Sequence, residues 1–530
     1  MISEIRAGLG WLAVMGVLAG CGGGDPAGPR LPPVDPPPAR PVLDPTYRAS
    51  GRGAAGDVFV HLFEWKWTDV AAECEQVLGP AGFRAVQVSP PQEHIVLAGS
   101  PWWIRYQPVS YSIDRSRGGT RAQFIDMVTR CRAAGVDVYV DAVINHMTAG
   151  GGTGTNGTAY TKYAYPGLYA QADFHPACPV SDYQSAANVQ DCELVGLADL
   201  STGAASVQQK IADYLVGLAR LGVAGFRIDA AKHMQPVELN AILARVHQAL
   251  TVEGRPLPYW FAEVIDHGGE AVAARDYYGL GYASGGAADI TEFRFRGVGD
   301  KFLGTGGQRI SQLSPNGPPG SQFSPVAWGM MPADKAVVFL ENHDTQRSGG
   351  ISYRDPAAFR LANVWMLAQP YGYPSILSGY AFDRGTQSGR DAGPPSDAAG
   401  ATGDVACAAS LETAAIGQWV CEHRDPVIVR MLAFRRAVAG TDVGRWWDDG
   451  ANAIAFSRGD RGFVAINRDA AAVAATVPTG LPAGTYCDVL TGGRAGAACV
   501  GTSVVVAADG TVQLSLAANT AIAVHAGTRL

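Results

Sequence analysis

The sequence predicts an α/β protein, a (β/α)8 barrel followed by an antiparallel β domain, and three observations support this fold class. Short β-prone runs alternate with helix-length segments between about residues 56 and 380, which is the pattern of a parallel sheet covered by helices. Three of these runs lead into a carboxylate, at Asp229, Glu263 and Asp344. After about residue 440, short strands follow one another between Gly, Asp and Pro, as in antiparallel sheets.

The barrel elements can be placed in order from their periodicity and from the Gly and Pro residues between them. Strands are expected at residues 57–63, 85–89, 136–143, 225–230, 259–264, 289–295, 336–340 and 374–378. Helices are expected at residues 68–78, 121–134, 205–221, 236–250 and 357–368.

Residues 147–199 interrupt this alternation and are rich in Gly, Thr, Tyr and Ala. A structureless loop of that length is unusual in a compact domain, so we predict a small inserted domain, domain B. The catalytic barrel then comprises residues 48–146 and 200–439, and the β domain residues 440–530. Strands of the β domain are expected at 453–456, 462–466, 474–477 and 503–506.

The first 21 residues have the features of a targeting segment. Arg6 is a basic flank, and residues 9–18 form an apolar stretch that is too short to span a bilayer comfortably. The segment ends in Leu-Ala-Gly-Cys at 18–21, which resembles the bacterial lipobox, where the cysteine becomes the lipidated N-terminus. We therefore expect an exported bacterial protein, anchored at the cell surface or outer membrane through Cys21 or released from it. An ordinary secretory signal is the alternative.

Composition restricts the function further. Residues 22–47 are rich in Pro and Gly and are predicted to be a linker. The remaining chain can form a large core, because 47% of all residues are hydrophobic and only 17% are charged. The net charge is −7 without any Lys or Arg run, so no nucleic acid partner is expected. We expect a monomer.

The nine cysteines support an oxidising compartment. Without Cys21, eight remain, and eight cysteines allow 105 connectivities. No Cys-x-x-Cys occurs, which disfavours a zinc site. Short spacings suggest the pairs 178–192, 407–421 and 487–499, which leaves 74–131.

The carboxylates Asp229, Glu263 and Asp344 carry the functional argument. Each lies where a buried strand is expected to end, and the carboxyl ends of the strands build the active site of a parallel barrel. Three carboxylates at one rim suit the cleavage of a glycosidic bond through an oxocarbenium-like state. The alternative is that each carboxylate caps a helix or pairs with a cation.

Longer motifs surround these carboxylates. They read Asp-Ala-Val-Ile-Asn-His at 141–146, Gly-Phe-Arg-Ile-Asp-Ala-Ala-Lys-His at 225–233, Glu-Asn-His-Asp at 341–344, and Trp-Trp-Ile-Arg-Tyr-Gln-Pro-Val-Ser-Tyr at 102–111. From about residue 48 to the C-terminus the chain resembles the α-amylases of glycoside hydrolase family 13, most closely the animal-type branch that some bacteria also carry. The resemblance implies a barrel, an insertion after its third strand and a C-terminal β-sandwich.

The resemblance also implies an enzyme that hydrolyses α-1,4-glucosidic bonds of starch, glycogen and related glucans, endo-acting and with retention. Asp229 would be the nucleophile, Glu263 the general acid/base, and Asp344 a carboxylate that stabilises the transition state. Arg227 lies two residues before Asp229 on the same strand face and can hold it ionised. Apolar residues precede Glu263, and burial raises a carboxyl pKa.

Sugar contacts are implied for a further set of residues. His146 and His343 would contact hydroxyls at the cleavage point, although each could instead be a structural histidine bonded to a backbone carbonyl. Trp102, Trp103 and Tyr106 offer flat faces to pyranose rings, although aromatic clusters more often belong to a core. The other members of the predicted substrate site are Gln107, Arg227, Lys232 and His233.

One calcium ion is implied by four matching positions: Asn145, Asp199, and backbone carbonyls at Gln190 and His233. All four are oxygen donors, as calcium requires. The ion would join domain B to the barrel beside the cleft.

Chloride is not expected to be a cofactor. Many animal-type relatives bind an activating chloride through an Arg, an Asn and a basic residue. Arg227 and Asn342 match the first two, but Ser375 stands where the basic residue belongs. Loss of one of two cations weakens anion capture, so we expect activity without chloride.

Two other functions were weighed. A same-fold enzyme that forms one short maltooligosaccharide or transfers glucosyl chains would use the same triad, and only its product profile differs. A catalytically inactive, glucan-binding surface lipoprotein would suit the anchor. It has no need for three crowded carboxylates, because their mutual repulsion costs stability.

Overall fold

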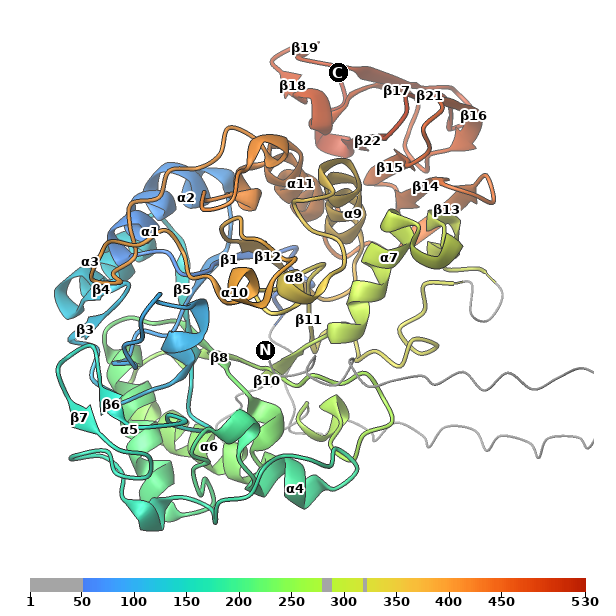
Figure 1. The fold of residues 1–530 in the computed structure, drawn as a ribbon. Coiled ribbons are helices and arrows are strands. Elements are labelled where there is room, and N and C mark those ends of the chain that lie inside the picture. Colours follow the sequence, from blue (N-terminus) through green and yellow to red (C-terminus); the bar gives the residue numbers. More distant parts are fainter. Residues whose placement is uncertain (1–50, 279–287, 318–321) are drawn as a thin grey trace, which may run out of the picture.

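The computed structural model describes residues 51–278, 288–317 and 322–530. Its centre is a closed barrel of eight parallel strands with helices outside, and a separate β domain follows at the C-terminus (Figure 1). The predicted fold class is therefore confirmed. The predicted targeting segment, residues 1–21, and linker, residues 22–47, lie outside the described residues.

Each barrel strand pairs with the next one along the chain, and the last pairs with the first. The strands are β1 (Phe59–Leu62), β2 (Ala85–Val88), β5 (Asp137–Ala142), β8 (Gly225–Ile228), β9 (Tyr259–Ala262), β10 (Ala288–Thr291), β11 (Ala336–Val338) and β12 (Tyr373–Ser378). Every residue of these eight strands is buried except Asp137 and Ser375, which are half-buried. This is expected for a parallel sheet that is covered on both faces.

Helices cover the outside of the barrel. They are α1 (Trp67–Glu73), α2 (Gly79–Ala81), α3 (Arg121–Ala133), α5 (Ala205–Arg220), α6 (Pro236–Val252), α7 (Gly297–Leu303), α9 (Pro356–Ala368) and α11 (Pro426–Ala437). Two short helices, α8 (Thr345–Ser348) and α10 (Gln387–Asp391), instead line a cavity beside the strand ends. In α5 the buried side chains Val207, Ile211, Leu215 and Leu218 recur every three or four residues, which gives one apolar face toward the strands.

Two elements differ from the sequence prediction. The strand expected at 289–295 ends at Thr291, and Phe293–Arg296 form a 3₁₀ turn. The Glu292 side chain accepts a hydrogen bond from Arg294 N (3.1 Å) and so caps this turn. The helix expected at 68–78 is α-helical only to Glu73 and continues as a π-helix over Cys74–Leu78.

The insertion between β5 and α5 is mostly irregular. Its regular elements are β6 (Gly152–Thr153), β7 (Ala159–Tyr160) and α4 (Ala186–Asp191). The predicted cysteine pairs are all confirmed as disulfides: Cys74–Cys131, Cys178–Cys192, Cys407–Cys421 and Cys487–Cys499.

The C-terminal domain consists of two antiparallel four-stranded sheets. Their strands are β13 (Val443–Asp448), β14 (Ala453–Arg458), β15 (Gly462–Asn467) and β22 (Thr520–His525), and β16 (Val473–Pro478), β21 (Thr511–Leu516), β20 (Ser503–Val506) and β17 (Gly484–Cys487). Phe463 of one sheet and Leu514 of the other share one core. The outer face of the first sheet packs against α9 and α11 (Figure 1). Within the described part of the chain, no helix is both long and apolar enough to cross a bilayer.

Candidate active site

A cavity of about 250 Å³ opens at the carboxyl ends of the barrel strands. It brings together nine residues that the sequence singled out. These are Trp102, Trp103, Tyr106, Gln107, His146, Asp229, Glu263, His343 and Asp344. The three predicted carboxylates thus meet at one place, although they follow three different strands.

Asp229 and Glu263 are positioned by neighbouring strand ends. Asp229 N donates to Ala142 O at 3.0 Å, and Glu263 N donates to Ile228 O at 2.9 Å, so both residues extend the barrel ladder by one position. Ala230 has a left-handed backbone (φ 49°), which is costly for a residue with a side chain. This conformation points Ala230 N at Glu263 Oε2, 2.9 Å away.

Arg227 contacts three carboxylates of the site. Its Nη1 donates to Asp141 Oδ1 at 2.6 Å and to Asp229 Oδ1 at 2.9 Å, and its Nη2 lies 2.6 Å from Glu263 Oε1. Of the carboxylates, only Asp229 was expected from the sequence to pair with Arg227. The structure shows that the same guanidinium serves the expected nucleophile, the expected acid and Asp141.

Burial dominates the electrostatics of this cluster. It raises the pKa of Asp229 well above its usual value and also raises the pKa of Glu263, while Arg227 opposes both shifts. Because several carboxyl groups share one cation, their titrations are linked. A cluster of this kind retains a proton to higher pH than isolated carboxylates do.

Asp344 is held by a turn at the end of β11. Asn342 Oδ1 accepts hydrogen bonds from Asp344 N (3.1 Å) and Thr345 N (2.8 Å). The neighbouring His343 stacks between the rings of Phe63 and Tyr106, with centroids at 4.8 and 5.3 Å. Burial lowers the pKa of His343 to about 3, so this imidazole is neutral at physiological pH.

Aromatic side chains from the 3₁₀ turn Trp102–Tyr106 form one wall of the cavity. Trp102 is 4% exposed and belongs largely to the core, whereas Trp103 and Tyr106 are half-buried. Trp103 Nε1 has no hydrogen-bond partner among the described residues. Tyr106 Oη donates to Asp141 Oδ2 at 2.8 Å.

His146 and Gln107 line the cavity but already have protein partners. His146 Nε2 lies 3.0 Å from Tyr106 O, which is the backbone contact that the structural alternative described. Gln107 Oε1 accepts from Ala149 N at 3.0 Å. Sugar contacts by these two side chains remain predictions.

Lys232 and His233 line an adjoining cavity, which also reaches Glu263. Lys232 Nζ donates to Ile265 O at 2.7 Å, pairs with Glu270, and lies over the ring of Tyr183. The predicted substrate site is therefore divided between two connected spaces with Glu263 where they meet.

The predicted calcium ligands also lie near one another. Asn145 Nδ2 lies 3.4 Å from Asp199 Oδ1, and His233 Nδ1 lies 2.8 Å from the carbonyl of Val189, the residue before Gln190. Asn145 Oδ1 is buried without a hydrogen-bond partner among the described residues. An orphaned buried oxygen beside a buried carboxylate fits a hard cation. Within the described residues, no group of three or more His, Cys, Asp or Glu forms a metal site, and the predicted set uses carbonyl oxygens instead.

Ser375 lies in β12 opposite Phe59 of β1. Phe59 and Tyr373 belong to the aromatic cluster inside the barrel, and side chains two residues apart on a strand share a face. Ser375 therefore points into the barrel, as a chloride ligand at that position would need to do.

Sequence analysis missed two contributors to the site. Asp141 stood only within a motif, and nothing in the sequence indicated that it would share Arg227 with Asp229 and Glu263, the expected nucleophile and acid. Val195 and Leu197 of the insertion also line the cavity. Val195 and Leu197 reach the cavity because of the way the insertion folds over the rim of the barrel. The periodicity of hydrophobic residues carries no information about that fold.

Comparison with known proteins identifies the family. Profiles described as "Alpha amylase, catalytic domain" and "Alpha amylase, C-terminal all-beta domain" match residues 105–382 and 446–527. An α-amylase of Tribolium castaneum is 44% identical over 489 residues, which is 89% of this chain and 94% of the relative. The pancreatic α-amylase of Sus scrofa is 41% identical over 89% of this chain and 94% of its own. The structure of a mutant α-amylase I from Eisenia fetida in complex with maltohexaose has a TM-score of 0.80 and 38% identity, over 91% of this chain and 99% of that one. The chain belongs to the α-amylase family, glycoside hydrolase family 13.

Proposed function

We propose that this protein is an α-amylase that hydrolyses internal α-1,4-glucosidic bonds of starch, glycogen and related glucans. The observation that carries the proposal is the meeting of Asp229, Glu263 and Asp344 in one cavity at the barrel rim. A maltohexaose complex of a structural relative supports an α-glucan as the substrate.

The proposed reaction has two displacement steps. Asp229 attacks the anomeric carbon as Glu263 passes its proton to the leaving glycosidic oxygen, and a glycosyl ester on Asp229 results. Glu263 then takes a proton from water, the hydroxide attacks the same carbon, and Asp229 leaves. Asp344, on the turn held by Asn342, supplies negative charge beside the oxocarbenium-like transition state.

Glu263 must change its contacts to act as the acid. In the structure its Oε2 accepts from Ala230 N and its Oε1 lies against Arg227, an arrangement that suits the carboxylate. Carrying the proton requires release of one of these contacts. The raised pKa of Glu263 favours the protonated form in this step.

Release of reducing ends from soluble starch tests the proposal, with Glu263→Gln as the matched control. Wild-type protein is expected to release reducing sugar, and the variant to release less by at least about a thousandfold. Equal rates, or no release by wild-type protein, would contradict the proposal.

We further propose one bound Ca²⁺, held by Asn145, Asp199 and the carbonyls of Gln190 and His233. The support is the orphaned Asn145 Oδ1 beside Asp199. The ion would supply a structural link between the insertion and the barrel, close to His146, whose backbone bridges to Asp199. It has no part in the bond cleavage described above.

Export, anchoring at the cell surface through Cys21 and a monomeric state are proposed from the sequence alone. Stable anchoring requires more than one lipid chain, which the lipobox resemblance implies for Cys21. Cys21→Ser is expected to release the protein without changing its specific activity on soluble starch. Wild-type protein found only in the medium, with an unmodified N-terminus, would refute the anchor.

A further inference from the structure

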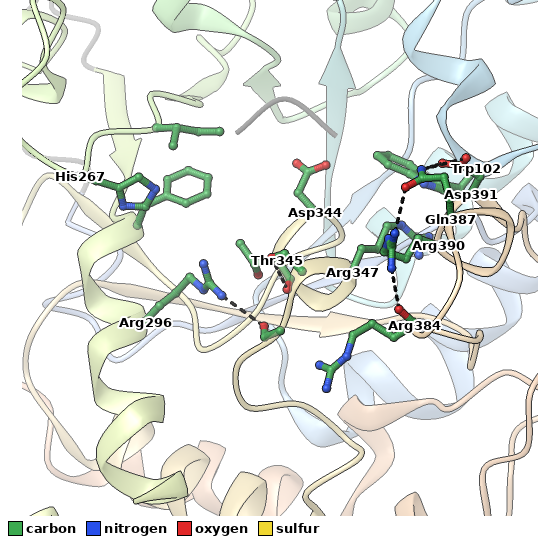
Figure 2. A pocket seen from close by; sticks show the side chains of 14 residues that line it. Trp102, His267, Arg296, Asp344, Thr345, Arg347, Arg384, Gln387, Arg390 and Asp391 are labelled. Atoms are coloured by element: carbon green, nitrogen blue, oxygen red, sulfur yellow. Dashed lines mark hydrogen bonds between the residues drawn. The ribbon is translucent and has the colours of Figure 1, made fainter. Parts of the chain in front are cut away.

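A third cavity, of about 570 Å³, adjoins the catalytic cavity and shares Trp102 and Asp344 with it. Four arginines line it: Arg296, Arg347, Arg384 and Arg390. Figure 2 shows Asp344 with Arg296 on one side and the other three arginines on the opposite side. The four come from the 3₁₀ turn before α7, from α8, from the loop after β12 and from α10, so only the folded chain brings them together.

Arg347 is fixed in the wall between the two cavities. Its guanidinium lies 4.6 Å from the Trp102 ring and 4.2 Å from the Phe382 ring, and its Nη2 donates to Tyr380 Oη at 2.9 Å. The residue is only 6% exposed. Its Nε and Nη1 have no hydrogen-bond partner among the described residues, so its charge is met by aromatic faces rather than by an anion.

Arg390 and Arg384 form the far end of this cavity. Arg390 Nη1 donates to Arg384 O (2.8 Å) and its Nη2 to Gln387 Oε1 (3.0 Å), so among the described residues the guanidinium is oriented by neutral oxygens (Figure 2). Arg384 Nη1 has no partner in the described part of the chain.

Arg347, Arg384 and Arg390 are not paired with carboxylates in the described part of the chain, although the charge of Arg390 lowers the pKa of Asp383 from a distance. Within the described residues, no carboxylate oxygen lies within 4.0 Å of a guanidinium nitrogen of Arg347, Arg384 or Arg390. Of the two aspartates on the cavity wall, Asp391 accepts hydrogen bonds from Gln387 Nε2, and Asp344 belongs to the catalytic centre. Grouped cations without anions repel one another, and a bound anion relieves that repulsion.

The positive charges of this cavity also act on the neighbouring Arg354. Burial lowers the pKa of Arg354, and the charges of Arg384 and Arg347 lower it further, while Tyr353 and Glu341 act in the opposite direction. Arg354 Nη2 is held by Phe382 O at 2.7 Å, and its guanidinium lies 4.6 Å from the Phe382 ring. The positive region thus continues from the cavity along the loop that follows β12.

We propose that this cavity binds an anionic substituent of the glucan chain, and that the substituent is a phosphate monoester. Guanidinium groups present paired N–H donors that match phosphate oxygens. The anion belongs at the Arg384–Arg390 end, because Asp344 repels it at the other. The inference rests on the proposed function, since it needs a glucan in the adjoining catalytic cavity.

The test compares two substrates prepared from one phosphorylated amylodextrin, one left intact and one treated with phosphatase. The kcat/KM of both is measured at fixed ionic strength for wild-type protein and for Arg384→Gln/Arg390→Gln. Arg121→Gln is the matched control, because Arg121 is an exposed arginine on α3, outside the cleft. Because both substrates meet the same enzyme sample, any loss of folded protein cancels in their ratio.

The ratio of kcat/KM for intact over dephosphorylated dextrin is expected to fall by about tenfold or more in the double variant, and to stay constant in Arg121→Gln. An unchanged ratio in the double variant would overturn the proposal. No hydrolysis of either dextrin by wild-type protein would instead remove the proposed function itself.

Inorganic phosphate distinguishes a glucan substituent from a free anion. Added to wild-type protein at constant ionic strength, it is expected to slow hydrolysis of the intact dextrin more than that of the dephosphorylated one. This difference is expected to vanish in the double variant. Equal slowing of both substrates would assign the arginines to free phosphate and would also overturn the proposal.

Discussion

The same strands build two regions of the barrel with different chemistry: an apolar floor of packed aromatic rings and a charged rim that holds the candidate active site. At the floor, Phe59 packs against the rings of Tyr139, Phe261 and Tyr373, with centroids 4.8 to 5.7 Å apart. The floor hydroxyls are paired, as in Tyr259 Oη, which donates to Asp289 Oδ2 at 2.7 Å. At the rim, one guanidinium serves three carboxylates and burial raises carboxyl pKa values.

Only two residues along a strand separate the floor from the rim. Phe261 belongs to the floor and Glu263, two residues later on the same face of the chain, belongs to the rim. Aromatic burial stabilises the fold, whereas gathered carboxylates cost stability. The floor is therefore expected to control stability and the rim to control rate, and the following substitutions test that division.

The largest effect is expected at the rim. Asp229→Asn and Asp344→Asn should each lower kcat on soluble starch by at least about a thousandfold, because they remove the nucleophile and a transition-state charge. In Asp229→Asn the melting temperature should stay the same or rise, since a buried charge is lost. Activity of either variant within about tenfold of wild type would exclude that residue from the triad.

At the floor, Phe59→Ala should lower the free energy of unfolding by about 3–5 kcal/mol, because it opens a cavity among the aromatic rings. β1 carries none of the three catalytic carboxylates, so kcat per folded molecule should change little. Phe59→Leu is the matched control and should cost under about 1.5 kcal/mol. Denaturant unfolding and active-site titration would check both, and a thousandfold loss of kcat in Phe59→Ala would break the proposed division.

Calcium should act on stability, as the floor does, although its site lies near the rim. At about a thousand times its dissociation constant, a ligand of the native state contributes about 4 kcal/mol. Chelation should therefore lower the melting temperature, and added calcium should restore it. In Asp199→Asn this response should be much weaker. A melting curve that is indifferent to exhaustive chelation would exclude the site.

The pH profile should reflect the raised pKa of Glu263. The acid works while protonated, so kcat/KM falls as pH rises through its pKa, and burial moves that pKa above the 4.5 of a free side chain. On the acid side, kcat/KM falls as the linked cluster gains a second proton and Asp229, whose pKa burial also raises, loses its charge. An alkaline limb centred at or below pH 4.5 would contradict the electrostatics of the rim.

The smallest effect is expected from chloride. Ser375 carries no charge, and Arg227 already serves three carboxylates. Rates in chloride and in acetate at equal ionic strength should differ by less than about twofold. Saturable activation by chloride would show that a cation elsewhere replaces the basic chloride ligand that is missing at Ser375.

The parts of the molecule that sequence could predict are those governed by local pattern. The periodicity of hydrophobic residues and the Gly and Pro residues between elements predicted the eight strands. Short cysteine spacings suggested three disulfides and left the fourth pair, and all four are present. The early end of β10 was missed because the Glu292 side chain caps a turn there, and a carboxylate after a strand has the same sequence signature whether it caps or catalyses.

Contacts between distant segments were beyond local pattern. That Arg227 contacts Glu263 as well as Asp229 depends on the lateral order of β8 and β9. Arg347 on α8, Arg384 in the loop after β12 and Arg390 on α10 share no motif, so only the folded chain shows that they converge. The groups proposed to react could thus be named from the sequence, whereas the charges around them are visible only in the structure.

The most direct test of the account is the configuration of the first product. NMR spectroscopy of a short α-1,4-maltooligosaccharide with wild-type protein should show the α-anomer first, because two displacements at the anomeric carbon restore its configuration. Glu263→Gln should form product at least about a thousandfold more slowly. Initial β-anomer, or α-anomer formed as fast by the variant, would contradict a nucleophile at Asp229 working with an acid at Glu263.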